Sequence, residues 1–193
     1  MSNTTNVNTT TQNQFAQFPA PEAHQRAVFH AQPYSLDAEG FYFNDMEDYQ
    51  TKYDANHDCF GLPVEEYEIQ FIDGETADAQ LFSAAGIDQA TLERFFDEVE
   101  PLDNHEKAAL YFLLQQGYKL DDAIDKIDEV TIQEGCAKDA AEQLFDEIYL
   151  DQIPEALQCY IDYDAFTRDC ECSGEFVEFN FDGTTYTCTN ANF

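Results

Sequence analysis

Negative charge runs along almost the whole chain, and this distribution constrains what the chain can fold into and bind. The sequence has 40 Asp and Glu residues against 8 Lys and Arg residues, a formal net charge of -32 at pH 7. Residues 37–76 hold 12 acids and 1 base, residues 77–150 hold 18 and 5, and residues 151–193 hold 9 and 1. An acidic tail would concentrate the charge at one end. The pattern therefore predicts a folded body coated with carboxylates.

Several classes of protein are excluded by this composition. Direct binding of DNA or RNA needs clustered Lys and Arg, which eight scattered cations cannot supply. Disorder is disfavoured because 44% of residues are hydrophobic and 15% are aromatic. No segment approaches the roughly 20 apolar residues that span a bilayer. The N-terminus has no signal-peptide pattern, so we expect a cytoplasmic protein with reduced cysteines and without membrane contact.

The order of elements predicts an α+β fold in three successive domains. Residues 1–23 are rich in Asn, Thr, Gln and Pro and are expected to form a disordered polar tail. Residues 24–76 are expected to form an N-terminal antiparallel β domain with a short helix, residues 77–150 a helical middle domain, and residues 151–193 an α+β C-terminal domain.

Local patterns define the expected elements within these domains. Strands are predicted over 27–31, 40–43 and 67–71, and a helix is predicted over 45–53. Four helices are predicted in the middle domain. The first two begin at the capping residues Asp88 and Asn104, and the other two span residues 121–130 and 137–150. Pro154 is expected in the first turn of another helix. A hairpin is predicted over 175–181 and 184–189, because Asp182-Gly183 favours its tight turn.

Carboxylates recur at helical spacing on the third and fourth of these predicted helices. Asp121, Asp125 and Asp128 are spaced i, i+4, i+7, and residues 139, 142 and 146 are spaced i, i+3, i+7. Like charges at these spacings destabilise a helix by about 0.2–0.5 kcal/mol per pair. Such ridges therefore indicate a surface with a partner. The residues of this predicted acidic surface are Asp45, Glu47, Asp48, Glu65, Glu66, Asp97, Glu98, Asp121, Asp122, Asp125, Asp128, Glu129, Asp139, Glu142, Asp146 and Glu147.

The amount of charge matches that of a DNA duplex. Duplex DNA carries one negative charge per roughly 1.7 Å of axis, so 32 charges correspond to about 54 Å of duplex. A compact globule of this length would have a radius of gyration of only about 16 Å. A string of small domains would spread the charge at closer to DNA-like density. We therefore predict a protein mimic of DNA that enters the basic groove of a DNA-binding enzyme.

Three other interpretations remain open. An acidic coat also suits a protein adapted to high salt. Residues 54–65 follow a calcium-binding loop at its first, third, fifth and twelfth positions, but Cys59 stands where that loop needs Gly. The alternative function is an acidic adaptor, calcium-dependent or general, that binds a basic nucleoid-type protein.

Catalysis and metal binding have less support. The chain has no GxSxG, no phosphate-binding glycine loop and no HExxH. Cys170 and Cys172 would lie on one side of an extended segment, with Cys188 on a nearby strand, and packed thiols are expected there instead of zinc. We therefore expect that the protein is not an enzyme and that it has no catalytic residue, no cofactor and no metal.

Residues 152–169, QIPEALQCYIDYDAFTRD, followed by Ser173-Gly174, resemble the C-terminal region of the ArdA antirestriction family. Weaker similarity runs through EEYEIQF at 65–71 and could extend over residues 27–193. The resemblance implies a non-enzymatic inhibitor from a bacterial mobile genetic element, built as an elongated three-domain chain. It would work in the host cytoplasm, mimic DNA, occupy the DNA-binding groove of Type I restriction-modification enzymes, and dimerise through its C-terminal domain.

The resemblance also implies roles for particular residues. The antirestriction motif and dimer contact map onto Leu150, Ile153, Pro154, Leu157 and Tyr160. Structural positions of the motif map onto Asp162, Tyr163, Arg168, Asp169 and Gly174. The chain departs from the family in its Asn/Thr-rich extension, in the lack of a tight Tyr-Asn turn and in having no Trp. These departures leave another DNA-processing defence complex open as the target.

Overall fold

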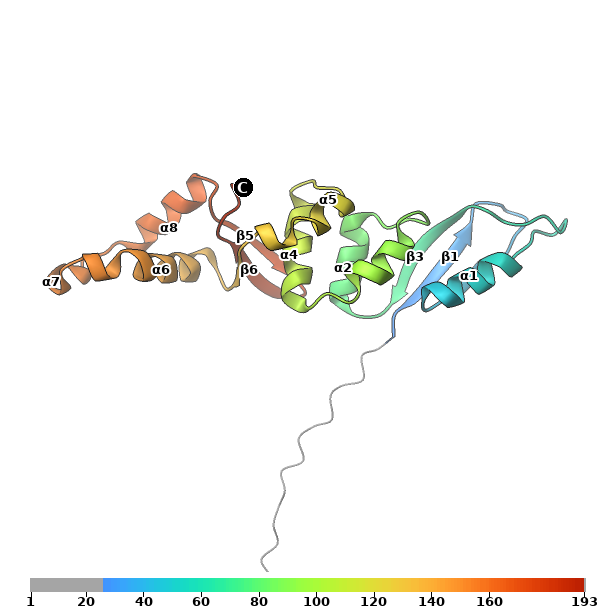
Figure 1. Cartoon of the computed structure of the whole chain (residues 1–193), viewed down its shortest axis with the longest axis horizontal. Coiled ribbons are helices and arrows are strands. Elements are labelled where there is room, and N and C mark those ends of the chain that lie inside the picture. Colours follow the sequence, from blue (N-terminus) through green and yellow to red (C-terminus); the bar gives the residue numbers. More distant parts are fainter. Residues whose placement is uncertain (1–25, 193) are drawn as a thin grey trace, which may run out of the picture.

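A computed structural model describes residues 26–192 of the chain. The body is elongated, and its elements follow one another along the long axis in nearly the order of the sequence (Figure 1). A sheet with one helix lies at one end, a group of helices lies in the middle, and a second sheet leads into three helices at the other end. The expected mixed α+β class is confirmed. The predicted tail, residues 1–23, lies outside the described residues.

The first sheet contains three antiparallel strands in the order β2-β1-β3. Its strands are β1 (Val28–Pro33), β2 (Phe41–Phe43) and β3 (Tyr67–Asp73). Helix α1 (Met46–Ala55) follows β2, and the Asp45 side chain caps it by accepting a hydrogen bond from the Asp48 backbone N–H at 2.8 Å. The three predicted strands are confirmed, β3 from its alternation of apolar and polar residues and β1 and β2 from short apolar runs, and the spacing of Met46, Tyr49 and Tyr53 predicted the helix.

The middle of the chain differs in detail from its prediction. Its helical elements are α2 (Thr76–Ala85), α3 (Leu92–Arg94), the π-helical turn η1 (Phe95–Val99), α4 (Asn104–Gln115), α5 (Leu120–Ile124) and the 3₁₀ turn η2 (Ile127–Glu129). Helix α2 was not predicted. The cap of α4 is Asp103, not Asn104, because Asp103 forms a reciprocal capping box with Glu106. The helix predicted over 121–130 is wrong, since α5 ends at Ile124.

The second sheet joins a segment of the middle to the C-terminal hairpin. Its antiparallel order is β4-β6-β5, with β4 (Ile132–Glu134), β5 (Val177–Phe181) and β6 (Thr184–Cys188). The predicted hairpin is confirmed, and Asp182 and Gly183 both have positive φ, 48° and 74°, as its turn requires. Strand β4 was missed because three residues carry little pattern of their own.

Four helical segments fill most of the chain between β4 and β5. They are α6 (Ala137–Ile148), the 3₁₀ turn η3 (Leu150–Gln152), α7 (Glu155–Gln158) and α8 (Tyr163–Cys172). Pro154 is the residue before α7 and not its first residue. The extended segment expected at Cys170 and Cys172 is wrong, because both lie in α8, with Cys170 buried and Cys172 exposed.

Two hydrophobic clusters form the core of the described residues. The larger runs without interruption from the first sheet through α2, η1 and α4 to the second sheet, and Phe29 at its centre has no exposed surface. The smaller lies between α6, α8 and Phe176. The division into three domains stays a prediction, and the larger cluster packs continuously across its first boundary at residue 76.

Candidate functional site: the acidic surface

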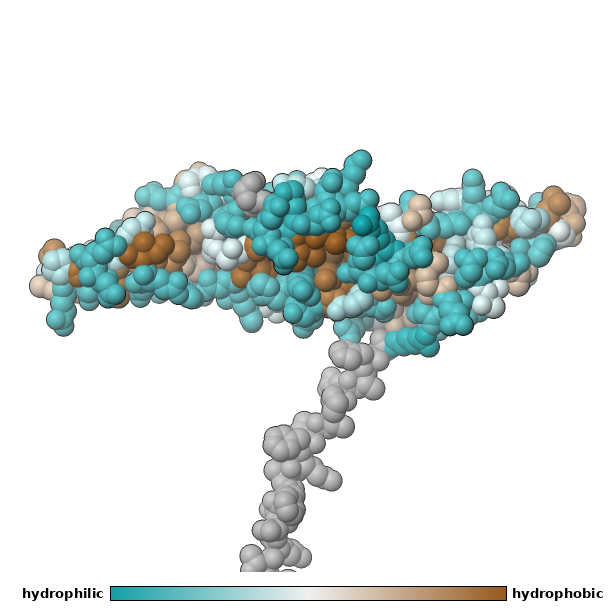
Figure 2. Space-filling model, viewed as in Figure 1, coloured by the Kyte–Doolittle hydropathy of each residue, from teal (hydrophilic) through white to brown (hydrophobic). Residues whose placement is uncertain are grey.

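Carboxylates cover the outside of the described chain. Of the Asp and Glu residues in 26–192, Asp78 alone is buried, and all the others are exposed or half-buried. Ionised carboxylates are costly to remove from water unless they are paired, so the sequence places them outside whatever the fold. Hydrophilic residues accordingly spread along the length of the face shown in Figure 2.

Half of the eight cations join one element to another. Arg26 binds Asp45 at the start of α1, Arg94 of α3 binds Asp121 of α5, and Lys138 of α6 binds Asp164 of α8. Each tie holds neighbouring elements together and neutralises a carboxylate near their contact. The rest of the negative charge has few cations to balance it, so a strong negative field surrounds the body.

At the first end of the molecule, three of the predicted acidic residues lie in or beside the first turn of α1. Asp45 caps the helix, and Asp48 forms an ion pair with Lys52 at 2.8 Å, whereas Glu47 is exposed. Carboxylates in a first turn also favour the positive end of the helix dipole. Glu65 and Glu66 are exposed in the loop that precedes β3.

In the middle, the predicted ridge of carboxylates is not formed as expected. Asp121 lies in α5, Asp125 is the capping residue that follows it, and Asp128 lies in η2. The three side chains are exposed, but they do not share one face of a continuous α-helix. Asp97 and Asp122 are exposed nearby.

Two predicted acidic residues of the middle are held by neighbouring cations. Glu98 accepts a hydrogen bond from Arg94 Nε at 2.9 Å, and this bond raises the pKa of the Arg94 guanidinium. Glu129 pairs with Lys126 over 2.6 Å, which raises the pKa of that lysine. Both carboxylates therefore have a structural role besides adding to the field.

Helix α6 carries the second predicted ridge on one continuous helix. Asp139, Glu142 and Asp146 all lie within its bounds, with Glu147 beside them. Glu147 accepts a hydrogen bond from Gln143 Nε2 at 2.9 Å. This ridge is an array of like charges at i, i+3, i+7, as the spacing predicted.

Contacts between α6 and α8 organise this ridge. Tyr163 donates a hydrogen bond of 2.5 Å from its hydroxyl to Asp146, which raises the tyrosine pKa. The Lys138 ammonium lies 2.7 Å from Asp164 and lowers the pKa of that carboxyl through a hydrogen bond. Glu142 lies 4.0 Å from the same ammonium. Tyr163, expected to have a structural role, thus contacts α6 directly.

The residues expected at a dimer contact lie at the end of the molecule beyond α6. Leu157 and Tyr160 expose 54% and 80% of their surface, Pro154 is exposed, and Leu150 and Ile153 are half-buried. Ile148 and Tyr149 are exposed beside them. An apolar patch of this kind indicates an interaction surface. We call residues 148–160 the C-terminal patch.

The remaining motif positions have separate local roles. Asp162 caps α8 by accepting from the Ala165 backbone N–H at 3.0 Å. Arg168 and Asp169 are exposed on that helix, and the charge of Arg168 contributes to the lowered pKa of Asp164. Gly174 has a φ of 75°, a conformation that favours glycine just after a helix.

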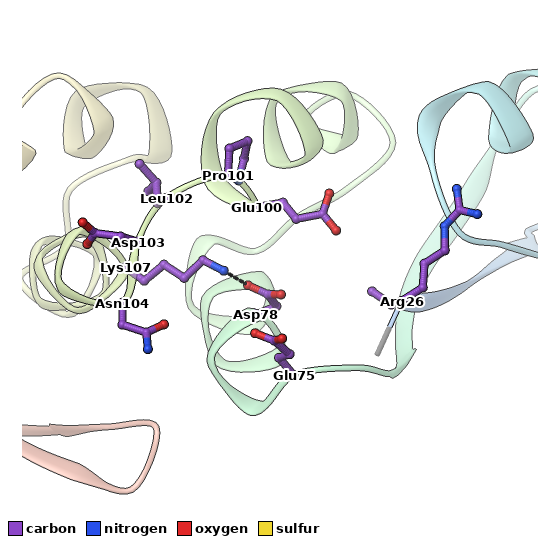
Figure 3. A pocket seen from close by; sticks show the side chains of 10 residues that line it. Arg26, Glu75, Asp78, Glu100, Pro101, Leu102, Asp103, Asn104 and Lys107 are labelled. Atoms are coloured by element: carbon purple, nitrogen blue, oxygen red, sulfur yellow. Dashed lines mark hydrogen bonds and ion pairs between the residues drawn. The ribbon is translucent and has the colours of Figure 1, made fainter. Parts of the chain in front are cut away.

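A buried ion pair between α2 and α4 was missed by sequence reasoning. Lys107 Nζ lies 2.6 Å from Asp78 Oδ1, and the two side chains are only 6% and 8% exposed. They line a pocket of about 870 Å³ together with Glu75, Glu100 and Arg26 (Figure 3). Partial burial, and then repulsion from Asp78, raise the Glu100 pKa. The available signal was helical spacing, because Asp78 precedes Leu81 and Phe82 by three and four residues and Lys107 precedes Leu110 and Leu114 by three and seven, which places both charges on an apolar helix face.

The loop with a calcium-like pattern is a hydrogen-bonded turn. Helix α1 includes Asp54 and Ala55, the first two positions of the calcium-like loop. Asp58 Oδ1 accepts hydrogen bonds from the backbone N–H groups of Phe60 and Leu62, each at 2.8 Å. Across residues 26–192, no three His, Cys, Asp or Glu side chains come together as a metal site would require. In the same part of the chain, no helix is long and apolar enough to cross a membrane.

Comparison with known proteins gives one match. The family model described as ArdA, antirestriction protein, matches residues 30–183, about four fifths of the chain. No curated protein and no solved structure matches. The matched range runs from β1 to the turn between β5 and β6, and it includes both the acidic surface and the C-terminal patch.

Proposed function

The chain belongs to the ArdA antirestriction protein family, and we propose that it works as a DNA mimic that occupies the DNA-binding groove of a Type I restriction-modification enzyme. Proteins of this family are inhibitors and not enzymes. The mechanism is competition: carboxylates take the places of phosphates in a basic groove, and no bond is made or broken. A bacterial cytoplasm, and a gene carried on a mobile genetic element, are the setting in which such an inhibitor acts.

The observation that carries this proposal is the exposure of the carboxylates along an elongated body. Asp78 is the single buried one among those of residues 26–192, and the exposed ones extend from α1 to α8. A DNA-binding groove is lined with cations that follow a linear array of phosphates. A long body with distributed charge fits such a groove better than one concentrated acidic patch would.

The use of the cations supports the same mechanism. Six of the eight cations form ion pairs with described carboxylates, and four of these cations hold neighbouring elements together. Few cations therefore remain to repel a basic groove. Negative potential over a whole surface also accelerates association with a positive partner, and this steering weakens as salt is added.

We propose further that two copies associate through the C-terminal patch. Leu157 and Tyr160 are exposed at the end of the long axis, where contact between two copies would lengthen the acidic body instead of covering it. The double variant L157S/Y160S should be monomeric in light scattering at micromolar concentration, while the wild-type protein has the mass of a dimer. A monomeric wild-type protein would refute this part of the proposal.

The decisive experiment is a competition titration. Labelled duplex DNA is bound to a purified Type I methyltransferase core and displaced by the protein at several salt concentrations. The proposal predicts stoichiometric displacement that weakens with salt. If the folded protein displaces no DNA at any salt concentration, the proposed target is wrong.

A charge variant tests whether the surface acts as a whole. D121N/D125N/D128N removes three exposed carboxylates, and only Asp121 has a cation partner, Arg94. Because the field is distributed, we expect binding to weaken severalfold and not to disappear. Loss of all binding in a folded triple variant would instead indicate a local hot spot. The variant S83N, at an exposed polar residue of α2, is the uncharged control.

A further inference from the structure

Two loops at the free end of the first sheet expose a second group of apolar side chains. Tyr34 and Leu36 belong to the loop between β1 and β2, and Phe60 and Leu62 belong to the loop after α1. All four are exposed, with Phe60 at 75% and Leu36 fully exposed. We call them the apolar tip, and they lie at the end of the molecule opposite to α7 (Figures 1 and 2).

Hydrogen bonds hold these loops in place. The Cys59 backbone N–H donates to the Asp37 carbonyl at 2.8 Å, so the two loops are joined directly. The Asp58 backbone N–H donates to the Leu62 carbonyl at 2.8 Å, and the Asp58 side chain accepts from Phe60 and Leu62. The apolar side chains are therefore presented by an ordered turn, which lowers the entropy lost on binding.

The arrangement is not explained by the core. Single exposed apolar residues are common on soluble proteins, but four of them on two joined loops form a patch of the kind that marks an interaction surface. The backbone bonds that fix the turn do not need Phe60 or Leu62 side chains, because Asp58 binds their main-chain groups. The patch therefore serves something outside the described chain.

Charge around the patch decides what it fits. Asp37, Glu65 and Glu66 are exposed beside it and Asp58 is half-buried, while Tyr34, Asp58, Glu65 and Glu66 line one shallow hollow. A second copy would bring the same four carboxylates against this rim, which is more unfavourable than contact through the C-terminal patch, whose own acids are Asp151 and Glu155. A partner with a basic rim around an apolar pocket would satisfy both parts of the surface.

We propose that the apolar tip is an anchor that inserts into an apolar, basic-rimmed pocket beside the DNA-binding groove of the target enzyme. This inference rests on the proposed function and adds a contact that DNA itself does not make. Charge provides the approach, and the aromatic and aliphatic side chains of the tip provide a contact that is kept when the field is screened. Buried aromatic anchors of this kind commonly dominate the binding energy of an interface.

The test compares two variants in the same DNA-displacement titration. F60S/L62S removes both side chains but keeps the backbone groups that Asp58 binds. The control is I72S, an exposed apolar residue near the other end of β3. We expect F60S/L62S to weaken displacement by at least about tenfold, the size expected for an anchor residue, and I72S to have no effect.

Salt dependence separates the anchor from the charged surface. The loss in F60S/L62S should be the same at about 0.1 M and 0.3 M salt, because apolar contact is not screened. The loss in E65Q/E66Q should shrink as salt is added. If the wild-type protein displaces DNA and F60S/L62S does so equally well, the anchor is refuted while the proposed function stands.

Two other outcomes overturn the inference for different reasons. If the wild-type protein displaces no DNA, the proposed function fails and the anchor fails with it. If F60S/L62S lowers the mass measured by light scattering, the tip joins two copies of this chain and does not contact the target. Circular dichroism of both variants checks that the sheet is intact.

Discussion

The buried ion pair between Asp78 and Lys107 makes the sharpest prediction about stability. It joins α2 to α4 with a distance of 2.6 Å between Nζ and Oδ1, and both side chains are less than a tenth exposed. The variant D78A removes the carboxylate and leaves the lysine ammonium in a place with little water. The variant K107M does the reverse, and D78A/K107M removes both charges.

Removing one partner of a buried pair costs about 3–5 kcal/mol, because the other charge stays desolvated. In this protein the pocket beside the pair and the nearby Glu100 carboxylate can partly solvate Lys107. We therefore expect D78A to lower the free energy of unfolding by about 3 kcal/mol, at the lower end of the range. The double variant should recover most of that loss, since a pair and an apolar replacement often differ little.

Urea unfolding at pH 7 measures these changes. The matched control is D48A, which breaks the surface pair between Asp48 and Lys52, with side chains 33% and 42% exposed. Exposed pairs contribute about 0–1 kcal/mol, so D48A should change stability by no more than that. A loss below about 1 kcal/mol for D78A, equal to that of the control, would refute the argument that burial gives the pair its importance.

Three further predictions concern single residues. E100Q should raise the free energy of unfolding at pH 7, because the raised pKa of Glu100 shows that its charged form is disfavoured in the folded state. This gain should vanish as the pH falls toward 4.5, the ordinary pKa of a glutamate side chain. Urea unfolding at several pH values measures the gain, and a gain that grows at low pH would contradict the sign. F29A should cost about 3–5 kcal/mol in the same assay, because Phe29 packs against five aromatic rings, and a cost below about 1 kcal/mol would contradict this packing. G86A should lower the melting temperature through a loss of about 1–2 kcal/mol, because its φ of 62° is strained for alanine; no change would mean that α2 ends differently.

Local sequence patterns predicted those strands and helices that a few consecutive residues are enough to identify. Alternation over 175–181 and Asp182-Gly183 predicted the hairpin, and an apolar stripe predicted α4. Strand β4 is different, because Ile132 pairs with Cys188, a residue far along the chain. Three residues carry too little pattern to identify a strand whose partner is unknown.

Competition between local preferences explains the other errors. Cys170 and Cys172 were placed in an extended segment because they alternate, but the Asp162 cap and packing of Cys170 against α6 favour a helix there. The ridge at 121–128 has helical spacing, yet its helix ends at Ile124 and continues as a 3₁₀ turn.

The sequence by itself determined that this protein has a strongly acidic surface. Eight cations cannot neutralise 40 carboxylates, and ionised carboxylates without partners cannot be buried, so nearly all of them must face water in any fold. The same reasoning holds for the exclusion of a basic nucleic-acid-binding patch. These conclusions need only the composition and the cost of desolvating a charge.

The tertiary structure decided which carboxylates are paired and where the apolar groups are exposed. Asp78 is buried because α2 and α4 pack with Lys107 opposite it, and Asp121 of α5 is paired because the fold brings Arg94 of α3 within its reach. The apolar tip exists because two loops that are distant in sequence share a hydrogen bond. Ion pairs and patches depend on distances between elements, and those distances arise only when the hydrophobic faces of the elements pack together.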